Sequence, residues 1–274
     1  MIPSKNALIA LLASLGLLTG CAELKEKLAP ASSKPVFLYS NYYNADGENR
    51  YPADGNFSEL MALLAEDFEV RVHREPLTEE TLGDVEVVLI ANPNKDAVEG
   101  NVPPPHVSAG DIATITRYVN KGGGLITTHN QENHNLENEQ FNRLLSIFGI
   151  QIVEKHTAAK AFEIPEEAPI IGGLLWAYII GNAIEIDPNH PTEPFAIVTN
   201  DRLQRPLKDE PDDAGILLAG AEWGDGRVLT IADSGWMLNE ALNGEEVAEV
   251  VIENADNREI ARRLAKWAAG LIDR

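Results

Sequence analysis

The chain has 274 residues, 43 of them acidic and 22 basic, which gives a formal net charge of -21 at neutral pH. Such a surplus of acids repels nucleic acid and anionic membrane surfaces, so neither is an expected partner. The acidic residues are spread along the sequence rather than gathered in one run. This spread favours a role in solubility over an acidic binding tail.

Residues 1–20 are typical of an export signal. They carry one charge, Lys5, followed by an apolar run from Ala7 to Leu18 that is too short to cross a bilayer as a helix. The run ends in Leu18-Thr19-Gly20-Cys21, which resembles the bacterial lipobox, where the thiol of the cysteine becomes attached to diacylglycerol. The sequence therefore predicts a lipoprotein signal peptide at 1–20 and lipidation at Cys21, which is the only cysteine.

The residues after Cys21 predict how the protein is held at the cell envelope. Ala22 stands where lipoproteins of the inner membrane often have Asp, which favours an outer-membrane anchor facing the periplasm or the surface. Residues 21–35 are rich in Ala, Lys, Glu, Ser and Pro and cannot bury enough apolar surface to fold, so they are expected to form a tether. Residues 36–273 have the length of one large domain.

Short apolar runs alternate with amphipathic stretches through the first half of this domain. Glu69 to Val72 alternates as an edge strand does, whereas Val85 to Ala91 is continuously apolar, as in a strand buried on both faces. The alternation predicts an α/β fold with a mainly parallel, doubly wound, flavodoxin-like sheet. Strands are predicted at 36–39, 69–72, 85–91, 125–128 and 150–153, and helices at 57–64, 108–121 and 136–148.

The second half has a different pattern. From 156 to 200, short runs are separated by prolines, which predicts an antiparallel extension of the sheet. The runs 215–222 and 227–232 flank Asp225-Gly226, a dipeptide typical of a β-hairpin. Asn257 is expected to cap a last helix that carries Ile260, Leu264 and Trp267 on one face.

Polar side chains follow several of the predicted strands. In an open parallel sheet, ligands bind beyond the carboxyl ends of the strands, so these side chains are expected to share one site. Their amides and carboxylates suit sugar hydroxyls, and Tyr43 and Trp236 could each offer a flat apolar face to a sugar ring. The predicted ligand-binding residues are Asn41, Tyr43, Asn44, Asn92, Asn130, Glu132, Asn133, His134, Asp233, Trp236 and Asn239.

The same residue types have a simpler explanation. Asn, Asp and Ser commonly follow strands because they turn the chain and cap the next helix. The two explanations differ in what they expect of individual side chains. On the ligand hypothesis, Asn133 and Asp233 are accessible at the surface, whereas turn residues are satisfied by their own backbone.

The sequence gives weak support to two kinds of catalytic chemistry. His129, Glu132 and His134 could bind a divalent cation such as zinc, but their spacing is not H-E-x-x-H, and two histidines in a polar loop are more often ordinary hydrogen-bonding groups. No other cofactor is expected. The sequence has no G-x-S-x-G motif, and Ser234, the nearest candidate nucleophile, lies between Asp and Gly as turn residues do. We therefore expect no covalent nucleophile.

A series of short segments between Tyr39 and Trp267 carries a family resemblance. The segments are Tyr42-Tyr43-Asn44, the run 87–90 with Asn92-Pro93, the run 118–124, Asn130-Gln131-Glu132-Asn133, the run 141–150, the run 224–228, Asp233-Ser234-Gly235-Trp236 and Asn239-Glu240. In order and spacing they resemble the class I glutamine amidotransferase-like domains. The resemblance is nearest to domains that accompany unsaturated rhamnogalacturonyl and glucuronyl hydrolases of glycoside hydrolase family 105, and to related lipoprotein and trehalose-utilisation-type domains.

The resemblance implies an accessory role more than an activity. Glutamine-hydrolysing members of this fold use a cysteine after a central strand, where this chain has Thr128-His129-Asn130. Three hypotheses follow: an accessory or saccharide-binding module used in polysaccharide utilisation, a metal-assisted hydrolase acting on a carbohydrate, and an adaptor that binds an envelope protein. Arg50, Lys95 or a bridging Ca²⁺ would have to offset the net negative charge if the saccharide were a uronate.

Overall fold

The computed structural model describes residues 34–44, 50–98, 100, 102–131, 134–198, 215–245, 247 and 254–274. Met1–Lys34 and Pro35–Arg274 form separate units, and the fold described below is that of the second. Cys21 and nearly all of the predicted signal and tether therefore lie outside the described residues. Among the residues that are described, no helix has the length and apolar character needed to cross a membrane.

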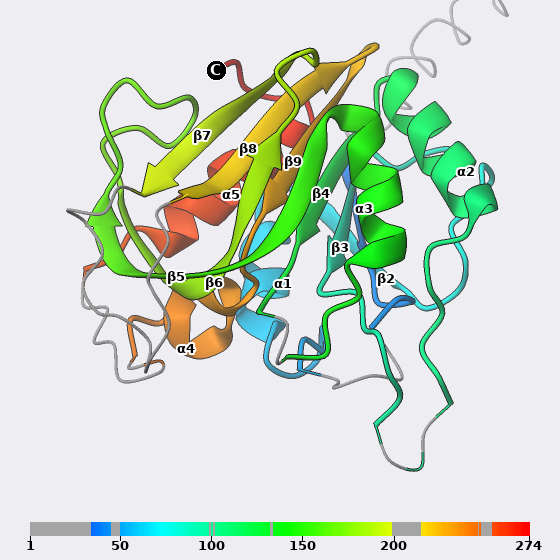
Figure 1. The fold of residues 1–274 in the computed structure, drawn as a ribbon, viewed down its shortest axis with the longest axis horizontal. Coiled ribbons are helices and arrows are strands. Elements are labelled where there is room, and N and C mark those ends of the chain that lie inside the picture. The colour runs from blue at the N-terminus through cyan, green and yellow to red at the C-terminus, as the bar shows by residue number, and fades with distance from the viewer. Residues whose placement is uncertain are drawn as a thin grey trace, which may run out of the picture. The chain divides into compact units, whose positions relative to one another are not determined.

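A single mixed sheet runs through the domain (Figure 1). Its strand order is β2-β1-β3-β4-β9-β8-β6-β5, and β7 pairs with β8. The strands from β2 to β9 in this order are parallel to their neighbours, and the remaining pairs are antiparallel. The parallel strands are β1 (Val36–Ser40), β2 (Glu69–His73), β3 (Val87–Ala91), β4 (Gly124–Thr128) and β9 (Gly226–Ile231). The antiparallel strands are β5 (Ile150–Glu163), β6 (Leu175–Ile186), β7 (Thr192–Val198) and β8 (Gly215–Trp223).

Helices cover both faces of the sheet, as the apolar composition of its central strands requires. On one face, α1 (Ser58–Leu64) and α5 (Asn257–Ala268) pack on side chains such as Leu89. On the other face, α2 (Ala109–Asn120) and α3 (Glu139–Leu145) pack on side chains such as Val88. The short helices are η2 (Ser146–Phe148), η3 (Gly235–Met237) and α4 (Asn239–Leu242).

Local signals in the sequence explain most of these boundaries. Ser108 and Asp111 form a capping box at the start of α2, so the predicted helix begins where expected. Gly149 adopts φ 73°, a left-handed conformation that ends the 136–148 helical region. The Trp223–Gly226 turn joins β8 to β9 as the predicted hairpin. The fold class, a mainly parallel sheet with an antiparallel extension, is confirmed.

The structure corrects two details. The strand predicted at 150–153 continues to Glu163, because β5 pairs along its length with β6 through several register shifts. Asn257 does not cap α5, whose N-cap is Asp256. Instead the Asn257 side chain bonds the backbone N and O of Ala177 at 3.0 Å each and the carbonyl of Trp236 at 2.9 Å, which ties α5 to β6 and η3.

Candidate functional site

The sheet changes direction between β1 and β3, and this topological switch point defines the candidate site. β1 pairs with β2 on one side and with β3 on the other, so the chain leaves the two strands in opposite directions. Such a point opens a crevice beyond the carboxyl ends of the two strands. Asn44 spans it here: its side-chain amide donates to Ala91 O at 2.8 Å, and its oxygen accepts from the side chain of Asn41.

A second group of polar side chains lies beyond β4 and β9. The hydroxyl of Ser234 donates to His129 O at 2.7 Å and lies 2.7 Å from the hydroxyl of Thr128. Asn182, from the middle of β6, donates from its side chain to Asn130 O at 2.7 Å. Asn130 in turn donates from its side chain to the hydroxyl of Tyr51. The antiparallel extension therefore closes over the carboxyl edge of the parallel strands.

Several polar atoms at this carboxyl edge are buried without a hydrogen-bond partner among the described residues. They are Ser40 Oγ at the end of β1, Asn92 Oδ1 after β3, His129 Nδ1 after β4 and Asn182 Oδ1 on β6. A buried polar atom without a partner costs about 1–3 kcal/mol, so such atoms are rare and call for an explanation. Atoms of the same kind are buried elsewhere too, at Thr116, Trp176 and Trp267 among others. At the carboxyl edge, a polar ligand or ordered water would explain them.

Burial also shifts the pKa of two titratable groups at this edge, Asp233 and His129. Asp233 is 1% exposed, and its burial raises the pKa of the carboxyl to about 8, against the lowering effect of the backbone N–H groups of residues 234–236 and the charge of Arg50. Burial lowers the pKa of His129 to about 3. At neutral pH the carboxyl of Asp233 is therefore mostly protonated and the imidazole of His129 is neutral, so neither side chain brings a full charge to this edge.

The backbone around the edge is strained. Asn92 adopts φ 39°, and Ile179 adopts φ 76° opposite Lys160 at φ 51° in the β5–β6 pair. A left-handed conformation is unusual for a β-branched residue such as isoleucine. Gly181 lets β6 approach closely, since a Cβ there would lie 2.3 Å from Tyr178 Oη and 2.7 Å from Asp233 Cβ. Strain of this kind persists only where the surrounding structure holds it, and it is enriched at functional sites.

The predicted ligand residues fall into three groups. Asn41, Asn44, Asn92, Asn130 and Asp233 all lie at the carboxyl edge, where they are buried. Tyr43 and Trp236 are fully buried, so neither ring offers a face to a sugar in this conformation. His134 lies beside the edge, where its backbone oxygen accepts from the Asn92 amide at 3.4 Å.

Asn239 has a structural role. Its side chain bonds Gly55 O and the backbone N of Glu59, both at 2.9 Å, and so holds the start of α1. Glu132 and Asn133 lie outside the described residues. The expectation that Asp233 is accessible is wrong, because β6 and η3 cover it.

The predicted metal ligands can be compared with the structure only in part. In the residues that the structure describes, no three His, Cys, Asp or Glu side chains are placed to hold a metal ion. The ring of His129 is fully buried, with Nε2 3.3 Å from Thr127 Oγ1, and packs edge-on against Phe141. Glu132, the third predicted ligand, is one of the residues not described.

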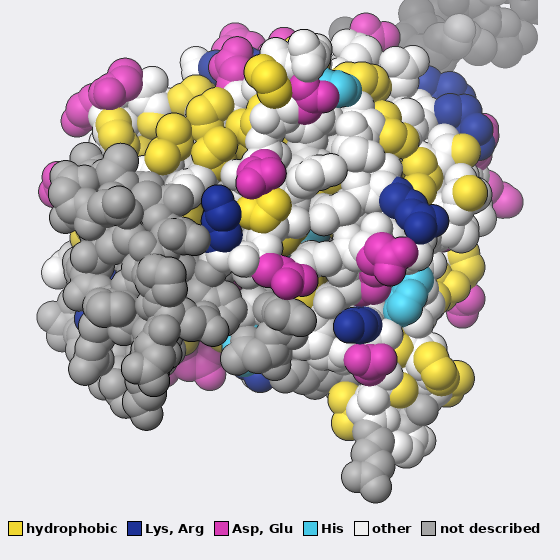
Figure 2. Space-filling model, in the orientation of Figure 1, with side chains coloured by type: hydrophobic (Ala, Val, Ile, Leu, Met, Phe, Trp, Pro, Cys, Tyr) yellow, Lys and Arg dark blue, Asp and Glu magenta, His cyan; other side chains and the backbone are white. Residues whose placement is uncertain are grey.

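Sequence reasoning missed Asn182, Tyr51 and Tyr178. Asn182 could have been found, because an amide within the apolar run 175–184 is expensive to bury unless it is bonded. Tyr51 and Tyr178 carry no comparable signal, since a tyrosine in an apolar context is ordinary core. Figure 2 shows Asp and Glu side chains scattered over the visible face rather than gathered in one patch.

Comparisons with known proteins identify the fold. No family model matches the chain, and no curated protein matches it in sequence. Among solved structures, the "mmIFT52 N-terminal domain" matches with a TM-score of 0.60 at 13% identity, over 85% of this chain and 96% of that chain. A putative ThuA-like protein from Bacteroides uniformis ATCC 8492 matches with a TM-score of 0.53 at 12% identity, over 87% of this chain and 93% of that one.

A second putative ThuA-like protein, from Parabacteroides merdae ATCC 43184, matches with a TM-score of 0.50 at 13% identity, over 86% of this chain and 90% of that chain. Identities this low establish the fold alone. The domain shares its mixed α/β, flavodoxin-like fold with these putative ThuA-like proteins.

Proposed function

We propose that this chain is a non-catalytic accessory module that binds a saccharide at the carboxyl edge of its sheet and is held at the cell envelope by a lipid on Cys21. The observation that carries the proposal is the set of buried polar atoms without partners at that edge: Ser40 Oγ, Asn92 Oδ1 and Asn182 Oδ1. Sugar hydroxyls both donate and accept, so they suit a serine hydroxyl and amide oxygens as partners.

The chemistry of the neighbouring residues supports binding rather than turnover. The only thiol belongs to Cys21, in the predicted tether, so the nucleophile of glutamine hydrolysis is missing from the sequence. The hydroxyl of Ser234 is held by His129 O and Thr128, and among the residues that the structure describes no imidazole nitrogen is one of its hydrogen-bond partners. A serine without an adjacent base is a weak nucleophile.

A thermal-shift screen of the full chain tests the binding. Neutral and acidic mono- and oligosaccharides are compared with Mg²⁺, Ca²⁺ and Zn²⁺, each with and without chelator. We expect a neutral saccharide to raise the melting temperature, because a ligand that binds only the folded state stabilises it. The key variant is Asn92→Gly, which removes the amide but keeps the left-handed backbone.

The matched control is Asn135→Gly. Asn135 is also left-handed, at φ 58°, but its side chain is bonded locally to Asp96 O at 2.7 Å and Asp96 N at 2.8 Å. Stabilisation should disappear in Asn92→Gly and persist in Asn135→Gly. Stabilisation by zinc with chelator-sensitive hydrolysis of a glycoside would instead support the hydrolase hypothesis. A chain that responds to nothing but co-purifies with an envelope protein would support the adaptor hypothesis.

The anchor is tested separately. Cys21→Ser removes the thiol that the lipid would occupy, so we expect the protein to move from the membrane fraction to the soluble fraction on cell fractionation. Equal membrane association of the variant and the original chain would exclude lipid anchoring through this residue. Detection of the diacylglycerol mass on the N-terminal peptide is the independent measurement.

A further inference from the structure

A cavity of about 390 Å³ lies at the amino ends of β3 and β4, opposite the carboxyl edge. It is bounded by the 79–86 loop, the last turns of α2 and Gly122–Gly123. Its volume lies within the range of pockets that hold small organic ligands. No residue of the carboxyl edge lines it, so it is a separate feature of the domain.

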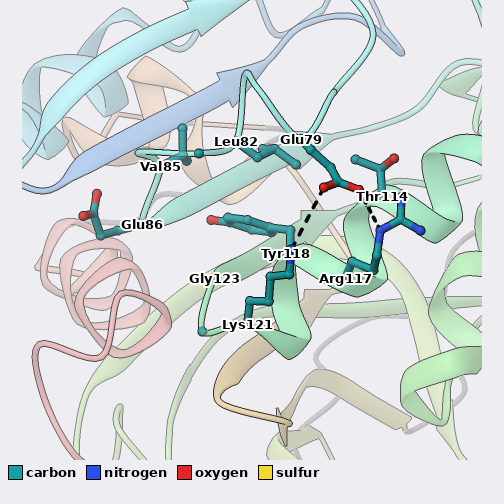
Figure 3. A pocket seen from close by; sticks show the side chains of 11 residues that line it. Glu79, Leu82, Val85, Glu86, Thr114, Arg117, Tyr118, Lys121 and Gly123 are labelled. Carbon is teal, nitrogen blue, oxygen red and sulfur yellow. Dashed lines mark hydrogen bonds and ion pairs between the residues drawn. The ribbon is translucent and has the colours of Figure 1, made fainter.

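The floor of the cavity is apolar. Leu82 and Val85 are buried, and the ring of Tyr118 lies between Leu82 and Gly123 (Figure 3). One side of the ring packs against Gly123, where an added Cβ would lie 2.2 Å from the ring. The ring is half-buried, and its hydroxyl donates to Gly124 O at 3.3 Å. The floor therefore suits a ring-shaped apolar group packed beside Leu82 and Tyr118.

The rim carries more positive than negative charge on one side. Arg117 donates from Nε to Glu79 at 2.9 Å, and Lys121 Nζ lies 4.0 Å from the same carboxylate, so two cations share one acid. Figure 3 shows these three side chains together, away from Glu86. Over the whole lining, Arg117 and Lys121 are balanced by Glu79 and Glu86, in a chain with 43 acidic and 22 basic residues.

The guanidinium of Arg117 still has bonding capacity. Only its Nε has a partner among the described residues, which leaves both terminal nitrogens, Nη1 and Nη2, for a second carboxylate. A guanidinium binds carboxylates in this two-pronged way. Glu86 does not compete for it, since its carboxylate accepts from the backbone N of Val36 at 2.5 Å.

The end of α2 offers no strong obstacle to an anion. A helix C-terminus repels negative charge through its unbonded carbonyls. Here Tyr118 O accepts from the backbone N of Gly123 at 3.1 Å, and Val119 O accepts from that of Gly122 at 3.0 Å. These carbonyls are therefore bonded, and the two cations beside them offset the repulsion that an anionic group would meet at this side of the rim.

From this geometry we infer a second binding site, for a small organic carboxylate with an apolar ring, whose carboxylate lies on Arg117 and Lys121 and whose ring lies on Tyr118. Benzoate is the simplest molecule with both parts. Benzamide keeps its shape without the charge, and acetate keeps the charge without the ring. A hexuronate keeps charge and ring but replaces the apolar edge by hydroxyls, so it should bind more weakly than benzoate.

Isothermal titration calorimetry with the full chain tests the site. We expect saturable binding of benzoate, at least about tenfold weaker binding of benzamide and of acetate, and weakening by added salt. Arg117→Gln should weaken benzoate binding by about tenfold or more, and Tyr118→Leu should weaken it several-fold. Arg143→Gln is the matched control, because Arg143 is similarly exposed on α3 and paired with Glu139 at 3.4 Å.

The outcomes are separable from those for the saccharide site. Asn92→Gly should leave benzoate binding unchanged, and Arg117→Gln should leave saccharide-induced stabilisation unchanged. Equal binding of benzoate and benzamide, unchanged binding in the Arg117→Gln and Lys121→Gln double variant, or no saturable binding up to about 10 mM would each overturn the inference. Unchanged melting temperatures of the variants confirm that any loss of binding is local.

Discussion

The polar groups at the two edges of the parallel strands differ in burial. At the carboxyl edge, amides, hydroxyls and the carboxyl of Asp233 are sealed beneath β6 and η3, and some of their atoms lack partners. At the amino edge, Glu79, Arg117 and Lys121 pair in the open, with side chains more than half exposed. At the carboxyl edge the low polarity of the surroundings strengthens each interaction, whereas at the amino edge water and salt screen it. Equal numbers of polar contacts should therefore have very unequal energetic weight.

The largest effect is expected at Asn257, behind the carboxyl edge. Asn257→Ala would leave Ala177 N, Ala177 O and Trp236 O without their side-chain partner. Each stranded buried group costs about 1–3 kcal/mol, so we expect the free energy of unfolding to fall by about 3 kcal/mol or more. Urea denaturation followed by circular dichroism measures it. Asn189→Ala, at an exposed asparagine bonded to Asp187, should cost less than about 0.5 kcal/mol.

The next effect is on the pH dependence of stability. The pKa of Asp233 rises from 3.8 to about 8 on folding, so the folded state holds a proton that the unfolded state releases, and stability falls as pH rises through that interval. The pKa of His129 falls from 6.5 to about 3, so its burial makes stability rise with pH up to 6.5. The two effects oppose each other between pH 3.8 and 6.5.

Above pH 6.5 only Asp233 acts of these two groups, and stability should fall toward pH 8 by about 1 kcal/mol per pH unit. Asp233→Asn should remove this fall. Because the opposing effect of Asp233 is then gone, the variant should also show a decline in stability below pH 6 that His129 causes and that Asp233 offsets in the original chain. Denaturation midpoints measured from pH 4 to 9 provide the test. A variant that loses stability above pH 6.5 as steeply as the original chain would mean that Asp233 is already ionised in the folded state.

The sequence predicted the parallel part of the sheet well because its signals are local. The capping box at Ser108, the left-handed Gly149 and the continuous apolar run that became β3 each specify their own segment. The right-handed crossover rule then orders the strands. Chain order alone thus placed Asn41, Asn92 and Asn130 at one edge.

The state of those residues could not be predicted in the same way. Asp233 is buried because β6, more than 40 residues earlier in the chain, crosses over it at Gly181, and that approach depends on the strained pairing of Ile179 with Lys160. No local pattern encodes a long-range contact of this kind. The expectation that Tyr43 and Trp236 face a ligand was wrong for the same reason. An aromatic residue that follows a strand gives no sign of which distant segment will cover it.

The smallest effect on stability is expected at the amino edge. It tests most directly whether polar contacts there are weaker than those at the carboxyl edge. Arg117 and Glu79 are paired at 2.9 Å, but their side chains are 52% and 59% exposed. Exposed pairs of this kind contribute about 0.2–1 kcal/mol. In a double-mutant cycle of Arg117→Gln and Glu79→Gln, we therefore expect a coupling of about 0.5 kcal/mol or less, which vanishes at high salt.

The network of Asp67 with Arg262 and Lys266 provides the reference for that cycle. Asp67 is only 20% exposed and accepts from Arg262 at 2.9 Å and Lys266 at 3.0 Å, so its coupling to Arg262 should be larger and less sensitive to salt. If the Arg117–Glu79 coupling equals or exceeds it, the amino edge is less screened than its exposure implies. The free nitrogens of Arg117 would then be fixed in place before any ligand arrives, and the difference between the two edges would be one of composition rather than of burial.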